Sequence, residues 1–168
     1  MNITAGIYKG RKLEVPDSNI TRPTLSKVRM GVFNTLYSII GEFDNLSFLD
    51  VFGGSGIMGL EALSRGFKKV TIFEKHPKAA NIIKNNYNKL NLTPNLLIGD
   101  STKLISNTEY HDVIYIDPPY SSNLYIDIID KTTGNIIILE HSTNIDLSKY
   151  KIIKEKNYGD KLITFLKK

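Results

Sequence analysis

The feature that most constrains the fold is a regular alternation of short apolar runs with segments of helical periodicity. Five runs are rich in β-branched and aromatic residues and are bounded by Gly, Pro or Asn: SFLDVF (47–52), KVTIFE (69–74), NLLIG (95–99), DVIYID (112–117) and NIIILE (135–140). Such runs are typical of buried strands, and strands that alternate with helices form β-α-β units around a mostly parallel sheet. We therefore expect an α/β fold.

The segments between these runs predict helices, and the tail predicts a hairpin. GIMGLEALSRG predicts a helix from about Ser55 to Gly66, because glycine commonly follows the last helical residue. A second helix is expected from Pro77 onward, where apolar residues recur every three or four positions. The tail YKIIKEKNYGDKLITFLKK predicts two strands joined by a turn at Gly159, which would close one edge of the sheet.

The first forty residues have a different character. NITAGIYKGRKLEVP predicts two short strands around a turn at Lys9 and Gly10, and a helix with an apolar face follows near Val28 and Val32. Within TRPT, Pro23 keeps the preceding residue extended. We interpret residues 1–40 as an extension on an α/β core of residues 41–168, within a single domain.

The positive charge is concentrated in this extension. The chain has a net charge of +5, and residues 1–40 carry six basic and two acidic side chains, a net charge of +4. Three of the four arginines also lie there, and the planar guanidinium group suits phosphate. The pattern predicts a basic face for an anionic partner, although a general bias toward lysine would produce part of the same excess.

Other classes of protein are disfavoured by what the sequence lacks. It contains no cysteine, so a disulfide framework and a thiolate metal site are excluded, and its three histidines have no metal-ligand spacing. It has no run of about 18 apolar residues and no signal-peptide core near Met1. We expect a cytoplasmic protein without a metal ion or a membrane partner.

A glycine-rich turn follows the first predicted strand in LDVFGGSGIMG. It contains G-x-G-x-x-G as Gly54, Gly56 and Gly59, and Glu74 lies 20 residues after Gly54, as in a dinucleotide-binding unit. An NAD-dependent oxidoreductase is therefore one alternative. Asp50 argues against it, because a carboxylate at this turn would repel a pyrophosphate.

S-adenosylmethionine (SAM) fits the same turn better than NAD does. It carries adenosine and ribose without phosphate, and its amino group and sulfonium are positive. Asp50 would then face cationic groups, Glu74 could accept hydrogen bonds from both ribose hydroxyls, and Asp100 could accept one from the adenine amino group. Three acids at the ends of three successive strands, with glycines after the first, favour a SAM site.

The run DVIYIDPPY places an acid, two prolines and a tyrosine directly after a buried strand. The Asp117 side chain and the Pro118 carbonyl could accept hydrogen bonds from an exocyclic amine, which would localise its lone pair. The proline pair would hold that carbonyl rigidly, and Tyr120 could stack on an extruded base. This pattern predicts methylation of an amino group on a nucleobase or a similar planar group.

These motifs resemble those of the amino-group methyltransferases. More closely, GIYKGRKL, TRPT, FNTL, LDVFGGSGIMGLEALSRG, DVIYIDPPY and ILEHS are similar, in order and spacing, to the RsmD family of bacterial 16S rRNA guanine-N2 methyltransferases. The resemblance covers nearly the whole chain. It implies a Rossmann-like, seven-stranded SAM-dependent methyltransferase fold and a monomer that methylates guanine N2 in 16S rRNA. The substrate would be the 30S subunit or its assembly intermediate.

The resemblance also implies roles for individual residues. The cofactor-binding residues would be Asp50, Phe52, Gly53, Gly54, Ser55, Gly56, Glu74, Lys75, Asp100 and Ser101, with S-adenosylhomocysteine as product. The catalytic residues would be Asp117, Pro118, Pro119 and Tyr120. The RNA-binding residues would be Lys9, Arg11, Lys12, Arg22 and Arg29.

The chain departs from the family pattern at three places, one of which is the stretch from Tyr120 to Ile136, shorter here than in the family. Gly54 stands where alanine is usual, and Met30-Gly31 replaces a common Glu-Ala, where interior glycine weakens a helix by up to about 1 kcal/mol. Three alternatives stay open besides the main hypothesis. They are a DNA adenine or protein glutamine methyltransferase that shares the DPPY motif, the NAD-dependent oxidoreductase, and a non-catalytic RNA-binding protein.

Overall fold

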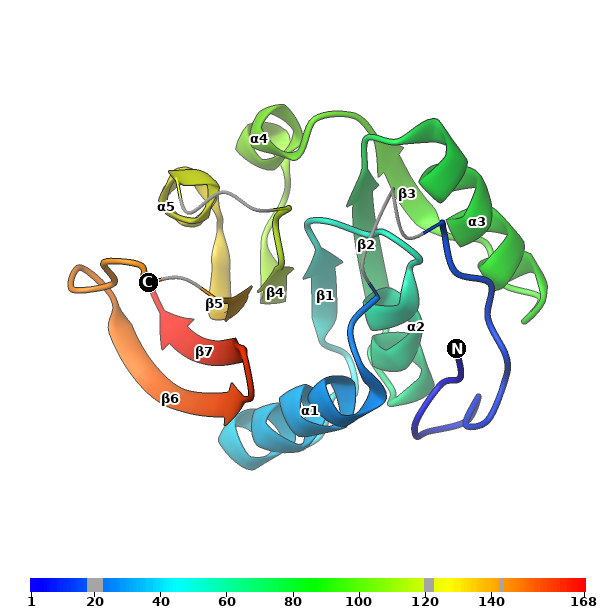
Figure 1. The fold of residues 1–168 in the computed structure, drawn as a ribbon, viewed down its shortest axis with the longest axis horizontal. Helices are drawn as coiled ribbons and strands as arrows, with labels where there is room; N and C mark the ends of the chain where they lie inside the picture. Colours follow the sequence, from blue (N-terminus) through cyan, green and yellow to red (C-terminus); the bar gives the residue numbers. More distant parts are fainter. Residues whose placement is uncertain (18–22, 120–122, 143) are drawn as a thin grey trace.

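The computed structural model describes residues 1–17, 23–119, 123–142 and 144–168 (Figure 1). The helices are α1 (Ser26–Ile40), α2 (Ile57–Ser64), α3 (Pro77–Asn88), α4 (Ser101–Leu104) and α5 (Asn123–Lys131), with a 3-10 turn η1 (Ile105–Asn107). The strands are β1 (Ser47–Asp50), β2 (Lys69–Glu74), β3 (Asn95–Ile98), β4 (His111–Ile116), β5 (Gly134–His141), β6 (Lys151–Tyr158) and β7 (Lys161–Lys167). In the described part of the chain, no helix is long and apolar enough to span a membrane.

The strands form one seven-stranded sheet in the order β3-β2-β1-β4-β5-β7-β6. The first five strands in this order are parallel, and β7 is antiparallel to both β5 and β6. The turn of this last hairpin contains Gly159 with a positive φ of 73°, as the sequence predicts. The mostly parallel sheet with a C-terminal hairpin is confirmed.

Helices cover both faces of the sheet, because neighbouring residues of each buried strand point to opposite sides. Phe48 packs in a core with residues of α1, α2 and α3, whereas Leu49 packs in a second core with residues of η1 and α5. Figure 1 shows α1, α2 and α3 along the bottom and right of the molecule, and α4 and α5 at the upper left. The result is a three-layer α/β/α arrangement.

The N-terminal segment forms the expected hairpin in a short, irregular form. Asn2 and Lys12 make an isolated antiparallel bridge, and the backbone N–H groups of Ile3 and Leu13 donate to the carbonyls of Arg11 and Met1 at 3.1 and 2.7 Å. The turn of this hairpin docks on α2: the backbone N–H of Ile7 donates to the carbonyl of Ser64 at 2.8 Å, and that of Tyr8 donates to the Ser64 hydroxyl at 2.9 Å. The short N-terminal hairpin is confirmed, with one isolated bridge among the described residues in place of two regular strands.

A buried carboxylate on α2 fastens the N-terminal segment and α1 to the core. Glu61 is fully buried and accepts hydrogen bonds from the backbone N–H and the hydroxyl of Thr4, each at 2.9 Å. It also pairs with Arg29 at 3.1 Å and with Arg65. Arg29 itself is fully buried and donates to the carbonyl of Asn2 at 2.8 Å. A buried charge with this many partners is a structural anchor.

The same observation corrects one expectation about RNA binding. Arg29 has no exposed surface and its guanidinium group is occupied by Glu61 and by backbone carbonyls. It cannot reach a phosphate from this position. The prediction that Arg29 binds RNA is therefore wrong, and the physical reason is its burial between α1, α2 and the N-terminal segment.

Gly31 lies in the middle of α1 because the helix approaches the C-terminal hairpin there. A Cβ atom on Gly31 would lie 1.7 Å from the hydroxyl oxygen of Tyr158, the last residue of β6. With the Tyr158 ring in this position, only glycine leaves room. Glycine lowers the helix propensity at this position, but it permits a contact between α1 and β6, two elements far apart in the sequence.

Candidate active site

Four acidic side chains follow the strands of one half of the sheet. Asp50 ends β1 and Glu74 ends β2, while Asp100 comes two residues after β3 and Asp117 directly after β4. The chain runs from β1 outward to β2 and β3, then crosses to β4 on the other side of β1. Such a switch point opens a crevice at the carboxyl ends of the strands, where α/β proteins bind ligands.

The loop between β1 and α2 approaches β2 without side chains in between. A Cβ atom on Gly53 would lie 2.4 Å from Cγ2 of Ile72, and the Gly53 N–H donates to the Phe73 carbonyl at 2.8 Å. Gly56 has a φ of 75°, a conformation that favours glycine. The glycines of GGSG therefore let this turn pack closely on β2 and α3.

Asp50 is a buried acceptor without a donor. Its side chain is only 1% exposed, and within the described residues neither carboxylate oxygen has a hydrogen-bond partner. Burial, together with the charges of Glu74 and Asp117, raises its pKa to about 7, although backbone N–H groups of Phe52 and Gly59 oppose the rise without completing a hydrogen bond. A cationic or hydrogen-bond-donating ligand would satisfy this group.

Glu74 is held by the glycine loop and by the start of the next segment. One carboxylate oxygen accepts from the Gly54 N–H at 2.8 Å, and the other accepts from the His76 N–H at 2.7 Å. Each oxygen keeps a second lone pair, so two hydroxyl groups of a ribose could still donate to it. The neighbouring Lys75 is exposed.

The segment after β3 closes the rim of the crevice. Asp100 is exposed and caps α4, because its Oδ1 accepts from the N–H and the hydroxyl of Thr102 at 2.9 and 2.6 Å. These hydrogen bonds lower the pKa of Asp100. Ser101 is buried and its hydroxyl donates to the Val51 carbonyl at 2.6 Å. Phe52 is half-buried beside it in the glycine loop.

Asp117 and the two prolines follow β4, the strand that pairs with β1. Asp117 is partly buried, Pro118 is buried and Pro119 is exposed, while Tyr120 lies outside the described residues. Burial and the charge of Glu140 raise the pKa of Asp117 to about 7, and Lys161 opposes this rise. Nζ of Lys161 lies 3.7 Å from Oδ1 of Asp117.

Two further residues belong to this region and were missed from the sequence. Asn86 of α3 is fully buried, and its side-chain N–H groups donate to the carbonyls of Ser55 and Glu14, both at 3.0 Å. It therefore connects the glycine loop with the N-terminal segment. In the sequence, the only indication of this role was that Asn86 is a polar residue beside the apolar stripe of the helix. Lys161 carried no local signal, because only the pairing of β7 with β5 brings it to Asp117.

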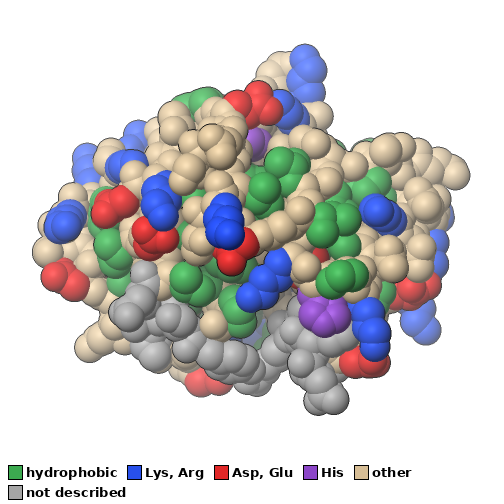
Figure 2. Space-filling view, turned by 90° about the horizontal axis from the view of Figure 1, so that it is seen from above, with side chains coloured by type: hydrophobic (Ala, Val, Ile, Leu, Met, Phe, Trp, Pro, Cys, Tyr) green, Lys and Arg blue, Asp and Glu red, His purple; other side chains and the backbone are tan. Residues whose placement is uncertain are grey.

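The predicted RNA-binding residues lie on the N-terminal segment. Lys9, Arg11 and Lys12 are exposed, and Arg11 also donates to the carbonyl of Lys89 at 3.2 Å. Arg22 lies outside the described residues. On the face seen in Figure 2, basic side chains are spread among acidic ones and do not gather in one patch.

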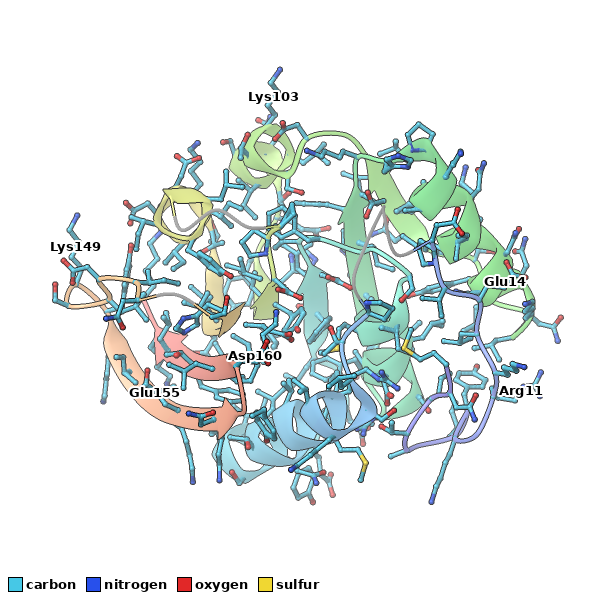
Figure 3. The ribbon with its side chains drawn as sticks, viewed as in Figure 1. Arg11, Glu14, Lys103, Lys149, Glu155 and Asp160 are labelled. Atoms are coloured by element: carbon cyan, nitrogen blue, oxygen red, sulfur yellow. The ribbon has the colours of Figure 1, made fainter. Side chains whose placement is uncertain are left out.

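Figure 3 shows Arg11 beside α3 on the same segment as Glu14, at the opposite end of the molecule from Lys149. In the described residues, no group of three or more His, Cys, Asp or Glu side chains could hold a metal ion.

Comparison with known proteins identifies the family. Residues 1–167 match the family described as Conserved hypothetical protein 95. The chain is 38% identical over 130 residues to Ribosomal RNA small subunit methyltransferase D of Haemophilus influenzae, a match that covers 74% of this chain and 66% of that protein. It is 32% identical over 137 residues to the protein of the same name from Escherichia coli K12, covering 80% and 68%. The chain belongs to the RsmD family.

Solved structures agree with the fold of this RsmD-family chain. A hypothetical protein of Thermus thermophilus superposes with a TM-score of 0.84, and the match covers 100% of this chain and 99% of that protein, at 24% identity. At this identity the likeness shows the fold alone. The chain is a Rossmann-like methyltransferase domain, and its sequence matches span about two thirds of the two curated relatives.

Proposed function

We propose that this chain transfers a methyl group from SAM to the exocyclic N2 of a guanine in 16S rRNA, within the 30S subunit or its assembly intermediate in the cytoplasm. One observation carries the proposal. Asp117 and the buried Pro118 follow β4, directly beside the buried Asp50 at the end of β1, in a chain of the RsmD family. The crevice thus combines an acceptor for a cationic cofactor with an acceptor for an amine.

The residues of the crevice fit SAM. The partnerless oxygens of Asp50 suit a positive ligand, and Gly53, with no space for a Cβ beside Ile72, lets the loop that follows Asp50 pack directly on β2. Glu74 would accept from the ribose hydroxyls, and Asp100 at the rim would accept from the adenine amino group. Phe52, Gly54, Ser55, Gly56, Lys75 and Ser101 would complete the cofactor site. When bound, SAM supplies a methyl group activated by its sulfonium.

Asp117 and Pro118 would prepare the guanine amine. The Asp117 carboxylate and the Pro118 carbonyl would accept hydrogen bonds from the two N2 hydrogens, so that the nitrogen lone pair points at the methyl group. Positive charge that develops on N2 would be stabilised by the carboxylate, which would then take the proton. Pro119 would keep the carbonyl rigid, and Tyr120 would stack on the base.

The N-terminal segment would bind the RNA backbone through Lys9, Arg11, Lys12 and Arg22. Lys9, Arg11 and Lys12 are exposed, and the segment is fixed to the core through Asn86 and Glu61. Contacts of this type contribute affinity that depends on salt and carry little sequence information. The choice of the target guanine would therefore depend on the base pocket and on the shape of the RNA.

The geometry disfavours the rival cofactor. An NAD pyrophosphate at the glycine loop would lie near Asp50, which is buried and has no cation beside it within the described residues. Two like charges in a region of low dielectric repel strongly. DNA adenine and protein glutamine remain the competing substrates, since the DPPY motif suits any planar amine.

The test is methyl transfer from labelled SAM to 30S subunits from a strain that lacks the gene, followed by nuclease digestion and mass spectrometry of the nucleosides. We expect label in N2-methylguanosine. Label in no nucleoside, although SAM binds, would redirect the proposal to a DNA or protein substrate.

Asp117→Ala should lower the rate at least about a hundredfold with nearly unchanged SAM affinity, because it removes an interaction made mainly in the transition state.

A further inference from the structure

A lysine from the C-terminal hairpin reaches the proposed catalytic carboxylate. Three strands contribute to this cluster: β4 ends just before Asp117, β5 carries Glu140, and β7 begins at Lys161. The antiparallel register pairs Glu140 with Ile163 and His141 with Leu162. Lys161 therefore lies just beyond the carboxyl end of β5, at the same edge of the sheet as Asp117.

The contacts hold the lysine between two carboxylates. Nζ of Lys161 lies 3.1 Å from Oε1 of Glu140 and 3.7 Å from Oδ1 of Asp117. Glu140 is 3% exposed and cannot move freely, because its Oε2 accepts from the Tyr115 hydroxyl and its backbone carbonyl accepts from the Tyr125 hydroxyl at 2.6 Å. The Glu140 carboxylate is thus a fixed acceptor that keeps the ammonium group beside Asp117.

The charges around Asp117 come from several elements. Glu140 on β5 and Asp50 on β1 are acidic neighbours, Tyr115 on β4 and Tyr125 on α5 are electrostatically coupled to it, and Lys161 on β7 supplies the positive charge. Without the lysine, two carboxylates would share a partly buried site, an arrangement that favours a proton on one of them.

We propose that Lys161 is a positioning residue for methyl transfer: its ammonium group, held by Glu140, favours the ionised form of the Asp117 carboxylate and orients it toward the guanine amine. This inference rests on the proposed function. In the transfer, the N2 lone pair forms the bond to the methyl carbon, the bond from that carbon to sulfur breaks, and its electron pair stays on sulfur. The N2 proton passes to the Asp117 carboxylate, which must be ionised to accept it.

The competing explanation is structural. An ion pair between Lys161 and Glu140 would also fasten the hairpin to β5, and its loss would then lower only the stability. The two explanations differ in the pH dependence of the reaction. If Lys161 favours the ionised form of Asp117, its removal raises the pKa of Asp117 and moves the acid limb of the rate profile to higher pH.

The experiment measures single-turnover methylation of 30S subunits between about pH 5 and pH 9. Lys161→Met and Lys161→Gln should move the midpoint of the acid limb up by about one pH unit and lower the rate about fivefold near pH 7, with recovery at higher pH. Lys161→Arg should retain the original midpoint. Glu140→Gln should move the midpoint down, because it removes a like charge.

Lys154→Met is the matched control, because Lys154 is an exposed lysine on the same hairpin and its removal changes the net charge equally. It should leave the profile unchanged. A Lys161→Met protein with the original midpoint, whatever its melting temperature, would overturn the proposal. SAM affinity, measured by calorimetry, should change little in any of these variants.

A second readout separates this inference from the proposed function. The pKa of Asp117 can be measured by carboxyl ¹³C NMR in the protein alone, with Asp117→Asn used for assignment. A higher value in Lys161→Met supports the charge role even if no methylated guanosine is formed. An unchanged value refutes it even if the wild-type protein methylates guanine N2.

Discussion

Asp50 shows how a single residue can favour ligand binding and oppose folding. The carboxylate is buried without a hydrogen-bond partner among the described residues, and its pKa is raised from 3.8 to about 7. The folded protein therefore holds this proton more tightly than the unfolded chain does. Protonated Asp50 therefore contributes stability to the folded protein. This contribution is fully present below about pH 4 and is lost as the pH rises through about 7.

Asp50→Asn should stabilise the protein at neutral and alkaline pH in the absence of SAM. A shift from 3.8 to about 7 corresponds to about 4 kcal/mol, and a gain of about 2 kcal/mol in the free energy of unfolding at about pH 8 is expected, since the buried amide also loses hydration. Near pH 4 the variant should instead be less stable than the wild type by about 2 kcal/mol, because the cost of burying the amide remains while Asp50 is protonated and carries no ionisation penalty. Urea titrations at the two pH values measure this, and an equal or lower stability of Asp50→Asn at pH 8 would contradict it.

At the scale of elements, α1 and the C-terminal hairpin determine each other's positions. Tyr158 at the end of β6 covers Gly31 of α1, where a Cβ atom would lie 1.7 Å from the hydroxyl oxygen and 2.5 Å from Cζ. The hairpin that brings Lys161 to Asp117 is therefore also packed against the helix that follows the N-terminal segment. A glycine that weakens an isolated helix is the residue that permits this contact.

Gly31→Ala should destabilise the protein by about 1 kcal/mol, because the added methyl group must displace the end of the half-buried Tyr158 side chain from its contact with α1. In a Tyr158→Ala background the same substitution should stabilise by up to about 1 kcal/mol, as expected for alanine in a helix interior. Denaturant unfolding of the four proteins in this cycle tests the change of sign. Gly31→Ala with the same effect in both backgrounds would show that Tyr158 does not restrict the position.

At the scale of the whole molecule, a short basic segment is held on a rigid core. Glu61 of α2 binds Thr4, and Asn86 of α3 accepts from the Glu14 N–H at 2.8 Å. The exposed Lys9 and Lys12 lie between these two attachment points. Charges held on a fixed backbone lose less freedom when RNA binds than charges on a flexible tail would.

Removing both charges, Lys9→Ala with Lys12→Ala, should weaken binding to 30S subunits and reduce the slope of log affinity against log salt by about two. SAM affinity should be unchanged. Lys149→Ala is the control, because Figure 3 shows this lysine at the opposite end of the molecule. An unaltered salt slope in the double variant, measured by filter binding, would remove these lysines from the RNA contacts.

The features that sequence determined are local. Strand periodicity located the five parallel strands, and both expected helices after the glycine loop and at Pro77 are present. The prediction that all five strands are buried was wrong for β3, which is mostly exposed because it lies at the edge of the sheet. The glycine turn, the acids at the strand ends and the tetrapeptide after β4 depend on residues adjacent in the chain, so their placement followed from β-α-β geometry. The four-residue α4 was not predicted because it is too short for a periodic pattern, and α5 was missed after the DPPY motif.

Only the tertiary structure decided how polar side chains are used. The basic residue Arg29 is buried against Glu61, 32 positions away, and the turn of the N-terminal hairpin gives hydrogen bonds to α2. Lys161 reaches Asp117 only because the C-terminal hairpin inserts β7 beside β5. Burial and ion pairing depend on which distant segments pack together in the fold, and local sequence propensity carries no information about that packing. The sequence by itself thus determined the fold and the chemical type of the crevice, whereas the packing of distant elements decided which charges face it.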